Sequence, residues 1–306
     1  MRRRPWRNFS GEVSGTGDGS DEHVLRGDFC VSPVLVRDRE NARATLEGNG
    51  IVIDIQNERD TRNIDIQKVG VKGIKYPIIV LDRAHGTQPV NARINMYVSL
   101  PHRFKGTHMS RFVEILNEFR GEINIRTFHT ILERVRLKLH AESAQMEIVF
   151  PYFIEKTAPV SKAKSLMEYT CLFCGLNGGE KTDFTVGVVV PVTTVCPCSK
   201  EISNNGAHNQ RSIVTVKVRF QRFFWIEDLI RLVEDSASGE VYSLLKRTDE
   251  KYVTERGYEH PMFAEDVVRN VAEKLNRLPN FTWYSVESEN FESIHNHSAY
   301  AYVEKG

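Results

Sequence analysis

The chain has 306 residues, of which 41% are hydrophobic and 26% are charged, and its formal net charge is +1. This near-zero charge argues against a broadly basic surface for nucleic acid. No apolar run approaches the roughly 20 residues that a membrane-spanning helix needs. The basic first residues are not followed by an apolar segment, so we predict no secretory signal and a cytoplasmic location.

Residues 1–62 are polar and weakly periodic, and we expect a partly flexible N-terminal arm there. Hydrophobic periodicity becomes clear in residues 63–180, which we predict to form a first structural unit. In chain order, this unit contains a strand at 69–81 that is broken by Pro77, a strand at 92–98, helices at 109–116 and 128–139, and strands at 144–150 and 169–176.

Residues 181–306 show the same order of elements and are predicted to form a second unit. Two tandem ββααββ units predict an α+β fold in which each antiparallel sheet carries helices on one face. The uncovered faces would be enclosed by closure of a barrel across subunits, so we predict an oligomer. We expect strands at 184–195, 214–220, 281–289 and 298–303, helices at 226–233 and 261–275, and a polar crossover at 236–259 with a short helix at 241–246.

The segment 191–212 carries the strongest chemical signal. A β-branched run leads into Cys196 and Cys198, which flank a proline, and a polar loop then leads to His208. Two thiolates and an imidazole between two strands suit a borderline metal such as zinc. One C-x-C and one histidine are an incomplete ligand set, so ordinary buried cysteines with a loop histidine remain the alternative.

The five cysteines are an odd number, which in a reducing compartment argues against a framework of disulfides. Cys171 and Cys174 form a C-x-x-C that could complete a four-cysteine zinc site with the later pair. However, residues three apart in a strand point to opposite faces of the pleat. We therefore interpret Cys171 and Cys174 as core residues.

Two further stretches offer the oxygen or nitrogen ligand that segment 191–212 lacks. Glu265 lies in the first turn of a predicted helix, where a carboxylate either reaches inward or simply complements the helix dipole. Glu292, His295 and His297 crowd the connection between the last two strands, and they form either a site or an ordinary surface loop.

The stretch 100–111 is basic and runs from a strand end into a helix start. Backbone N–H groups at a helix N-terminus bind anions together with Arg and Lys, so a phosphate site is weighed here against a solvated loop. The stretch contains Arg103, Lys105, His108 and Arg111, and Lys200 and Arg211 add positive charge elsewhere.

Several motifs are recognisable when they are taken together: Val-Gly-Val-Lys-Gly-Ile-Lys-Tyr-Pro, Lys-Gly-Thr-His-Met-Ser-Arg-Phe, Cys-Pro-Cys-Ser-Lys-Glu-Ile-Ser with Gly-Ala-His-Asn-Gln-Arg, and Glu-Ser-Ile-His-Asn-His. Over residues 65–304 the chain resembles GTP cyclohydrolase I of the type IB family. The resemblance implies a tunnelling fold of two tandem ββααββ units, a homotetramer built as a dimer of dimers, and active sites at subunit interfaces.

The resemblance also implies a role for each candidate residue. One divalent metal per subunit, zinc or manganese and less readily iron, would be held by Cys196, His208 and Glu265. Glu292 would accept hydrogen bonds from the guanine of GTP. His295 and His108 would act as acid/base groups beside the metal ligand Cys196. The triphosphate would be bound by Arg103, Lys105, Arg111, Lys200 and Arg211.

The implied activity is that of a hydrolase acting on cyclic amidine C–N bonds. Metal-activated water attacks C8 of GTP and gives 7,8-dihydroneopterin triphosphate and formate, the first step of tetrahydrofolate biosynthesis. Two alternatives stay open. An archaeal relative uses iron and yields 7,8-dihydroneopterin 2',3'-cyclic phosphate. A non-catalytic nucleotide-binding module with a structural zinc would be closed by a fourth protein ligand, for which Cys198 is the candidate.

Overall fold

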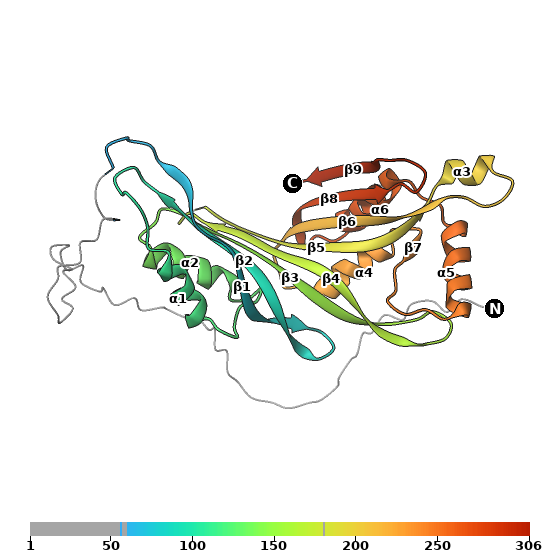
Figure 1. Ribbon diagram of the computed structural model, residues 1–306, viewed down its shortest axis with the longest axis horizontal. Helices are drawn as coiled ribbons and strands as arrows, with labels where there is room; N and C mark the ends of the chain where they lie inside the picture. The colour runs from blue at the N-terminus through green and yellow to red at the C-terminus, as the bar shows by residue number, and fades with distance from the viewer. Residues whose placement is uncertain (1–55, 57–59, 180) are drawn as a thin grey trace, which may run out of the picture. The chain divides into compact units, whose positions relative to one another are not determined.

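Alternating apolar and polar residues build one antiparallel sheet in the computed structural model, which describes Gln56 and residues 60–179 and 181–306 (Figure 1). The strands pair in the order β1-β2-β3-β4-β5-β6-β8-β9, and the short β7 pairs with β5. Their bounds are Ile66–Asp82 (β1), Gly86–Leu100 (β2), Ala144–Thr157 (β3), Lys164–Asn177 (β4), Thr182–Val195 (β5), Asn209–Phe220 (β6), Gly239–Glu240 (β7), Phe281–Phe291 (β8) and Ser298–Lys305 (β9). The predicted arm at 1–62 lies almost entirely outside the described residues.

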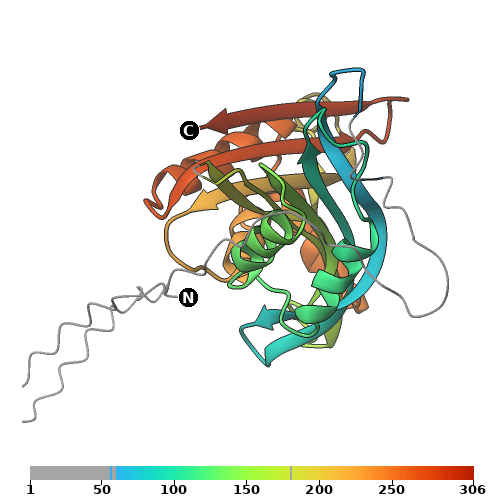
Figure 2. The ribbon, with the colours of Figure 1, turned by 90° about the vertical axis from the view of Figure 1, so that its left-hand side faces the viewer.

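The main helices pack on the sheet with their apolar sides. Contacts join α2 to β3 and β4, α4 to β5, and α6 to β8 and β9. Figure 2 shows α1 and α2, in green, against the curved strands. The helix bounds are Ser110–Glu118 (α1), Phe128–Lys138 (α2), Pro197–Ile202 (α3), Ile226–Glu234 (α4), Arg247–Glu259 (α5) and Ala264–Asn276 (α6). None of the described helices is long and apolar enough to cross a membrane.

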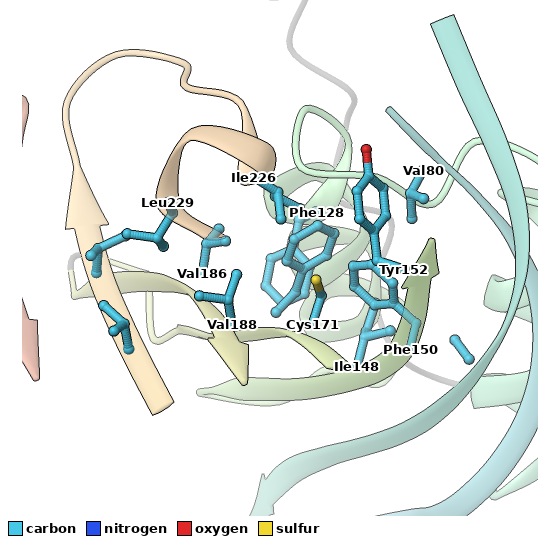
Figure 3. Packing of buried hydrophobic residues seen from close by; sticks show 14 of the residues in the cluster. Val80, Phe128, Ile148, Phe150, Tyr152, Cys171, Val186, Val188, Ile226 and Leu229 are labelled. Carbon is cyan, nitrogen blue, oxygen red and sulfur yellow. The ribbon is translucent and has the colours of Figure 1, made fainter. Parts of the chain in front are cut away.

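The core lies between the helices and one face of the sheet. Register places Phe173 beside Val186, Val186 beside Val218, and Val218 beside Tyr284, so that buried side chains form a row across four strands. Figure 3 shows Cys171 within this cluster, and burial raises the pKa of its thiol. Its neighbour Cys174 is only partly buried. The predicted opposite orientation of these two cysteines is thus consistent with the pleat.

The predicted fold class is wrong. We expected a tunnelling fold of two tandem ββααββ units with separate sheets that close into a barrel across subunits. The structure is instead largely one antiparallel sheet with few helices. The reason is the tight connection from β4 to β5: Gly178 N–H donates to Lys181 O (2.8 Å), and Asn177 pairs with Thr182. The last strand of the first half therefore pairs directly with the first strand of the second half.

Local expectations also change at three places. The second half contains α3, β7 and α5, which a simple repeat lacks. Residues 241–246 are not helical, and the helix of this crossover is α5 instead, which buries only Asp249 and Gly257 and so has no apolar stripe to reveal it. Strand β1 continues through Pro77, because β1 lies at the sheet edge, where a missing N–H donor is tolerated.

Candidate functional site

The helix-facing side of β5, β6 and β8 changes from apolar to polar toward one end of the sheet. Side chains two apart on a strand point the same way. Two residues beyond the ends of these alternating series lie Cys196, His208 and Glu292, so alternation directs all three toward one face. The alternating residues are Val190, Val192 and Thr194 on β5, Val214, Ser212 and Gln210 on β6, and Val286, Ser288 and Asn290 on β8.

Four buried polar side chains join these strands beneath that end. The hydroxyl oxygens of Thr194 and Ser212 lie 3.0 Å apart, and Asn290 Nδ2 donates to Thr194 Oγ1 (3.2 Å). Ser288 Oγ donates to Asn290 Oδ1 (3.1 Å). Each side chain belongs to a residue that is at most 1% exposed, so these bonds satisfy groups that water does not reach. The network ties together the strands that carry the predicted site residues.

Cys196 caps the N-terminus of α3, a helix that the sequence analysis treated as loop. Its Sγ accepts a hydrogen bond from Ser199 N (3.4 Å). The Cys196 N–H donates to His208 O (3.1 Å). Ser199 Oγ donates to Cys196 O (3.1 Å) and accepts from His208 N (3.1 Å). The cysteine and the histidine are thus held together through backbone and a single serine.

The His208 ring lies between Gln210 and Glu292. Its Nδ1 is 3.2 Å from Gln210 Oε1 and 3.9 Å from Glu292 Oε2, and Gln210 Nε2 donates to Glu292 Oε1 (3.4 Å). The structure therefore brings the predicted metal ligand and the predicted guanine acceptor together. The sequence analysis missed Gln210, although its place two residues after His208 at the start of a strand could have indicated it.

Glu265 is exposed in the first turn of α6. The approach to this helix is joined to the cysteine segment, because Met262 N–H donates to Val195 O (2.9 Å). Within the described residues, no group of three or more His, Cys, Asp or Glu side chains is arranged to hold a metal. The trio Cys196, His208 and Glu265 therefore stays a prediction. Its donors fit a divalent metal in kind: a thiol at a helix N-terminus, an imidazole engaged at Nδ1 and an accessible carboxylate.

The remaining predicted residues at this end are more exposed. His295 and His297 lie in the connection from β8 to β9, and their rings stack with centroids 5.1 Å apart. Arg211 follows Gln210 on β6 and so points to the opposite face. Lys200 donates to the carbonyl oxygen of Tyr258 near the C-terminus of α5, and its Nζ lies 4.4 Å from the Tyr258 ring centroid.

The basic stretch lies at the opposite end of the sheet. It follows Leu100, the last residue of β2. The end of β2 lies level with the start of β5, because the strand register pairs Val98 with Ala144, Ala144 with Asn177, and Asn177 with Thr182. Thr182 begins β5, and Cys196 directly follows the end of that strand. At roughly 3.3 Å per residue, about 40 Å of strand separates the two ends. Figure 1 shows α1 and α3 toward opposite ends of the sheet.

The contacts of the basic stretch show how its cationic side chains lie beside the start of α1. Arg103 approaches Glu142 at 4.0 Å and is largely exposed. The Arg111 N–H donates to His108 O (3.2 Å) where α1 begins, and α1 has no side chain capping its N-terminus. Lys105 is exposed on the loop before this helix. Cationic side chains beside a helix N-terminus that no side chain caps suit an anion.

A cavity of about 620 Å³ lies apart from both ends of the predicted site. Its walls include Tyr152, Phe153 and Glu227, and none of the predicted site residues lines it. The cavity therefore supplies no support for the predicted chemistry.

Comparison with known proteins identifies the family. Residues 52–301 match the family model described as Type I GTP cyclohydrolase folE2. The chain belongs to the type I GTP cyclohydrolase FolE2 family. It is 80% identical over 254 residues to GTP cyclohydrolase FolE2 of Syntrophus aciditrophicus, over 83% of this chain and 100% of the relative. It is 61% identical over 252 residues to the protein of that name from Citrifermentans bemidjiense, over 82% and 94% of the two chains.

FolE2 membership confirms the predicted function, a GTP cyclohydrolase of folate biosynthesis. The family resemblance drawn from the sequence motifs is confirmed at the level of the type I FolE2 family. The finer assignment to type IB is not confirmed. The matched range contains every predicted site residue, from Arg103 to His295, and so includes both ends of the sheet.

A solved structure gives a weaker likeness to the FolE2 chain. A uricase from Bacillus fastidious superposes with a TM-score of 0.47 at 9% sequence identity, over 78% of this chain and 92% of that chain. A likeness of this size carries no argument about the chemistry.

Proposed function

We propose that the protein is a type IB enzyme that hydrolyses GTP at C8 to give 7,8-dihydroneopterin triphosphate and formate. In this assignment it is a hydrolase acting on cyclic amidine C–N bonds. The observation that carries the proposal is the joining of Cys196, His208 and Glu292 at one end of the sheet, in a chain of the FolE2 family. We place the reaction in the cytoplasm.

Cys196, His208 and Glu265 are the proposed metal ligands, with zinc or manganese as the preferred metal and iron as a third option. A divalent metal held there would supply a water molecule of lowered pKa near neutral pH. The protein's own contribution is to keep the thiol at the α3 N-terminus and the imidazole against Gln210. Cys198, exposed on the same helix, has no ligand role in this proposal.

Glu292 is the proposed acceptor for the guanine N1–H and amino group. Its side chain is 13% exposed, so a bound base would meet a carboxylate that is largely shielded from water. Two parallel hydrogen bonds to one carboxylate select guanine over adenine, which presents no such pair of donors. His295 lies three residues further on and would move protons while the purine ring opens and the pterin ring closes.

The triphosphate is proposed to meet the basic stretch of another copy of the chain. Because about 40 Å of strand separates the two ends, Arg103, Lys105 and Arg111 do not serve the Cys196 end of their own chain. His108 would join that site as a second acid/base group. This division supports active sites at interfaces between copies of the chain, and the assembly that we propose is a homotetramer, a dimer of dimers. Arg211 and Lys200 would add contacts from the metal end, and Lys200 would have to leave Tyr258 to do so.

The proposal is tested by incubating the metal-loaded protein with GTP and measuring formate and the mass of the pterin product. Formate together with a triphosphate product is expected, and a 2',3'-cyclic phosphate would replace the proposed product. Cys196→Ala and Glu265→Ala are expected to lose both metal and activity. Cys198→Ala is the matched control: it should keep both, and loss of metal in Cys198→Ala would favour a four-ligand structural site.

A further inference from the structure

We propose that Gln210 is a positioning residue that sets the tautomer of His208 and the orientation of Glu292 at the same time. The inference rests on the proposed function, in which His208 holds the metal and Glu292 binds guanine. The Gln210 residue is 7% exposed and is the described side chain that bonds to both of these groups. A single buried amide thus connects the metal end of the site to the guanine end.

The two contacts of Gln210 determine which way its amide faces. A carboxylate only accepts hydrogen bonds, so the Nε2 amino group must face Glu292 Oε1, which lies 3.4 Å away. The amide oxygen then faces His208 Nδ1 at 3.2 Å. Because that oxygen also only accepts, Nδ1 must carry the hydrogen.

This arrangement has a consequence for metal binding. A neutral imidazole with its hydrogen on Nδ1 has its lone pair on Nε2, which is the atom then available to a metal. The second carboxylate oxygen of Glu292 lies 3.9 Å from His208 Nδ1 and favours the same tautomer. The two hydrogen bonds of Gln210 therefore leave Nε2 of His208 as the ring nitrogen available to a metal.

The surroundings hold Gln210 in place. Its backbone pairs with Thr194 of β5, and Thr194 belongs to the buried network with Ser212 and Asn290. A side chain that starts from a strand anchored on this network has little freedom to swing away. Gln210 is therefore suited to fix its two partners in a set geometry, as supporting residues around metal ligands do.

Two substitutions separate the two roles. Gln210→Met keeps the side-chain length and removes both hydrogen bonds. We expect metal affinity to fall by about 10- to 100-fold, as for other residues that orient a ligating histidine, and KM for GTP to rise. Gln210→Glu keeps an oxygen acceptor for His208 Nδ1 but sets a second carboxylate against Glu292. It should keep metal affinity within about threefold of wild type, since the histidine stays oriented, while KM rises at least about tenfold.

Metal affinity is measured by competition for zinc with a chromophoric chelator, which needs neither GTP nor turnover. Kinetics with GTP then give KM and kcat separately, and thermal melts check that each variant is folded. Asn209→Met and Asn209→Asp are the matched controls, because Asn209 is the exposed neighbour that points to the other face of β6. Both controls should behave as wild type.

The outcomes distinguish this inference from the proposed function. A wild-type protein that releases no formate from GTP would overturn the proposed function, while the zinc competition still tests the histidine half of the inference. Unchanged zinc affinity in Gln210→Met would overturn the claim that Gln210 sets the His208 tautomer. An unchanged KM for GTP in Gln210→Glu would overturn the claim that Gln210 orients Glu292. If Gln210→Met no longer melts cooperatively, the test rests on Gln210→Glu alone. If zinc affinity in Gln210→Glu falls by the same factor as KM rises, Gln210 has only a packing role.

Discussion

Two inactive variants of this protein are expected to restore each other's activity when they assemble together. One variant is Cys196→Ala, which removes a proposed metal ligand. The other is Arg103→Ala/Arg111→Ala, which removes proposed triphosphate contacts at the far end of the sheet. The strand β5, from Thr182 to Val195, spans about 40 Å at roughly 3.3 Å per residue. In the proposed function, each active site would therefore draw these two groups from different copies of the chain.

The size of the recovery follows from random assembly. In an equal mixture, a site is intact only when its cysteine comes from the arginine variant and its arginines come from the cysteine variant. About one site in four meets both conditions, so mixed oligomers should regain roughly a quarter of wild-type kcat per site. The two chains would carry different affinity tags, be expressed together and be purified through both tags before formate release is measured.

A matched mixture controls for changes in folding. Cys196→Ala combined with Glu292→Ala places both defects at the same end of the sheet, where His208 of one chain meets Glu292 of the same chain. That mixture should stay inactive. No recovery in doubly purified oligomers of the first pair would refute the argument that the two ends serve different copies.

Three further predictions concern stability. Lys200→Met loses its bond to the Tyr258 carbonyl at the end of α5 and should lower the free energy of unfolding by about 0.5–1.5 kcal/mol in urea titrations. Phe173→Ala empties a fully buried position and should cost about 3–5 kcal/mol by the same measurement. Burial raises the pKa of Asp249, but hydrogen bonds from Ser161 and from backbone N–H groups outweigh it and hold that pKa below its ordinary 3.8. The stabilisation is therefore complete above pH 3.8 and is lost as the pH falls toward the folded-state pKa, and Asp249→Asn should flatten this acid decline in melting temperature.

Strongly periodic segments were predictable from the sequence. The valines of β5 and β6 recur at every second position and lie in strands as expected, although β6 begins at Asn209 and not at Val214. The apolar stripe of α2 forms a helix that begins at Phe128 as expected. The pairing of β4 with β5 was not predictable in the same way. Alternation shows which residues face the core, but the joining of two hairpins into one sheet depends on the pairing of Asn177 with Thr182 and on the hydrogen bond from Gly178 N–H to Lys181 O.

The candidate site rests on motif residues, and the side chains that surround them were not predicted. Motifs drew attention to Cys196, His208 and Glu292, because thiols, imidazoles and carboxylates carry recognisable chemistry. Gln210 and Asn290 carry no such signal, and their importance depends on which strands lie side by side. Helix α3 was missed because six residues behind a capping cysteine leave no apolar period to detect.

The most direct test of the central claim uses GTP labelled with ¹³C at C8. If the protein opens the purine ring as proposed, ¹³C NMR should show the label leaving as formate, with about one formate for each GTP consumed and no label in the pterin product. Formate release should disappear in Cys196→Ala. Label that stays in the nucleotide while GTP is consumed would contradict the account, because the protein would then be hydrolysing phosphate bonds and not the purine ring.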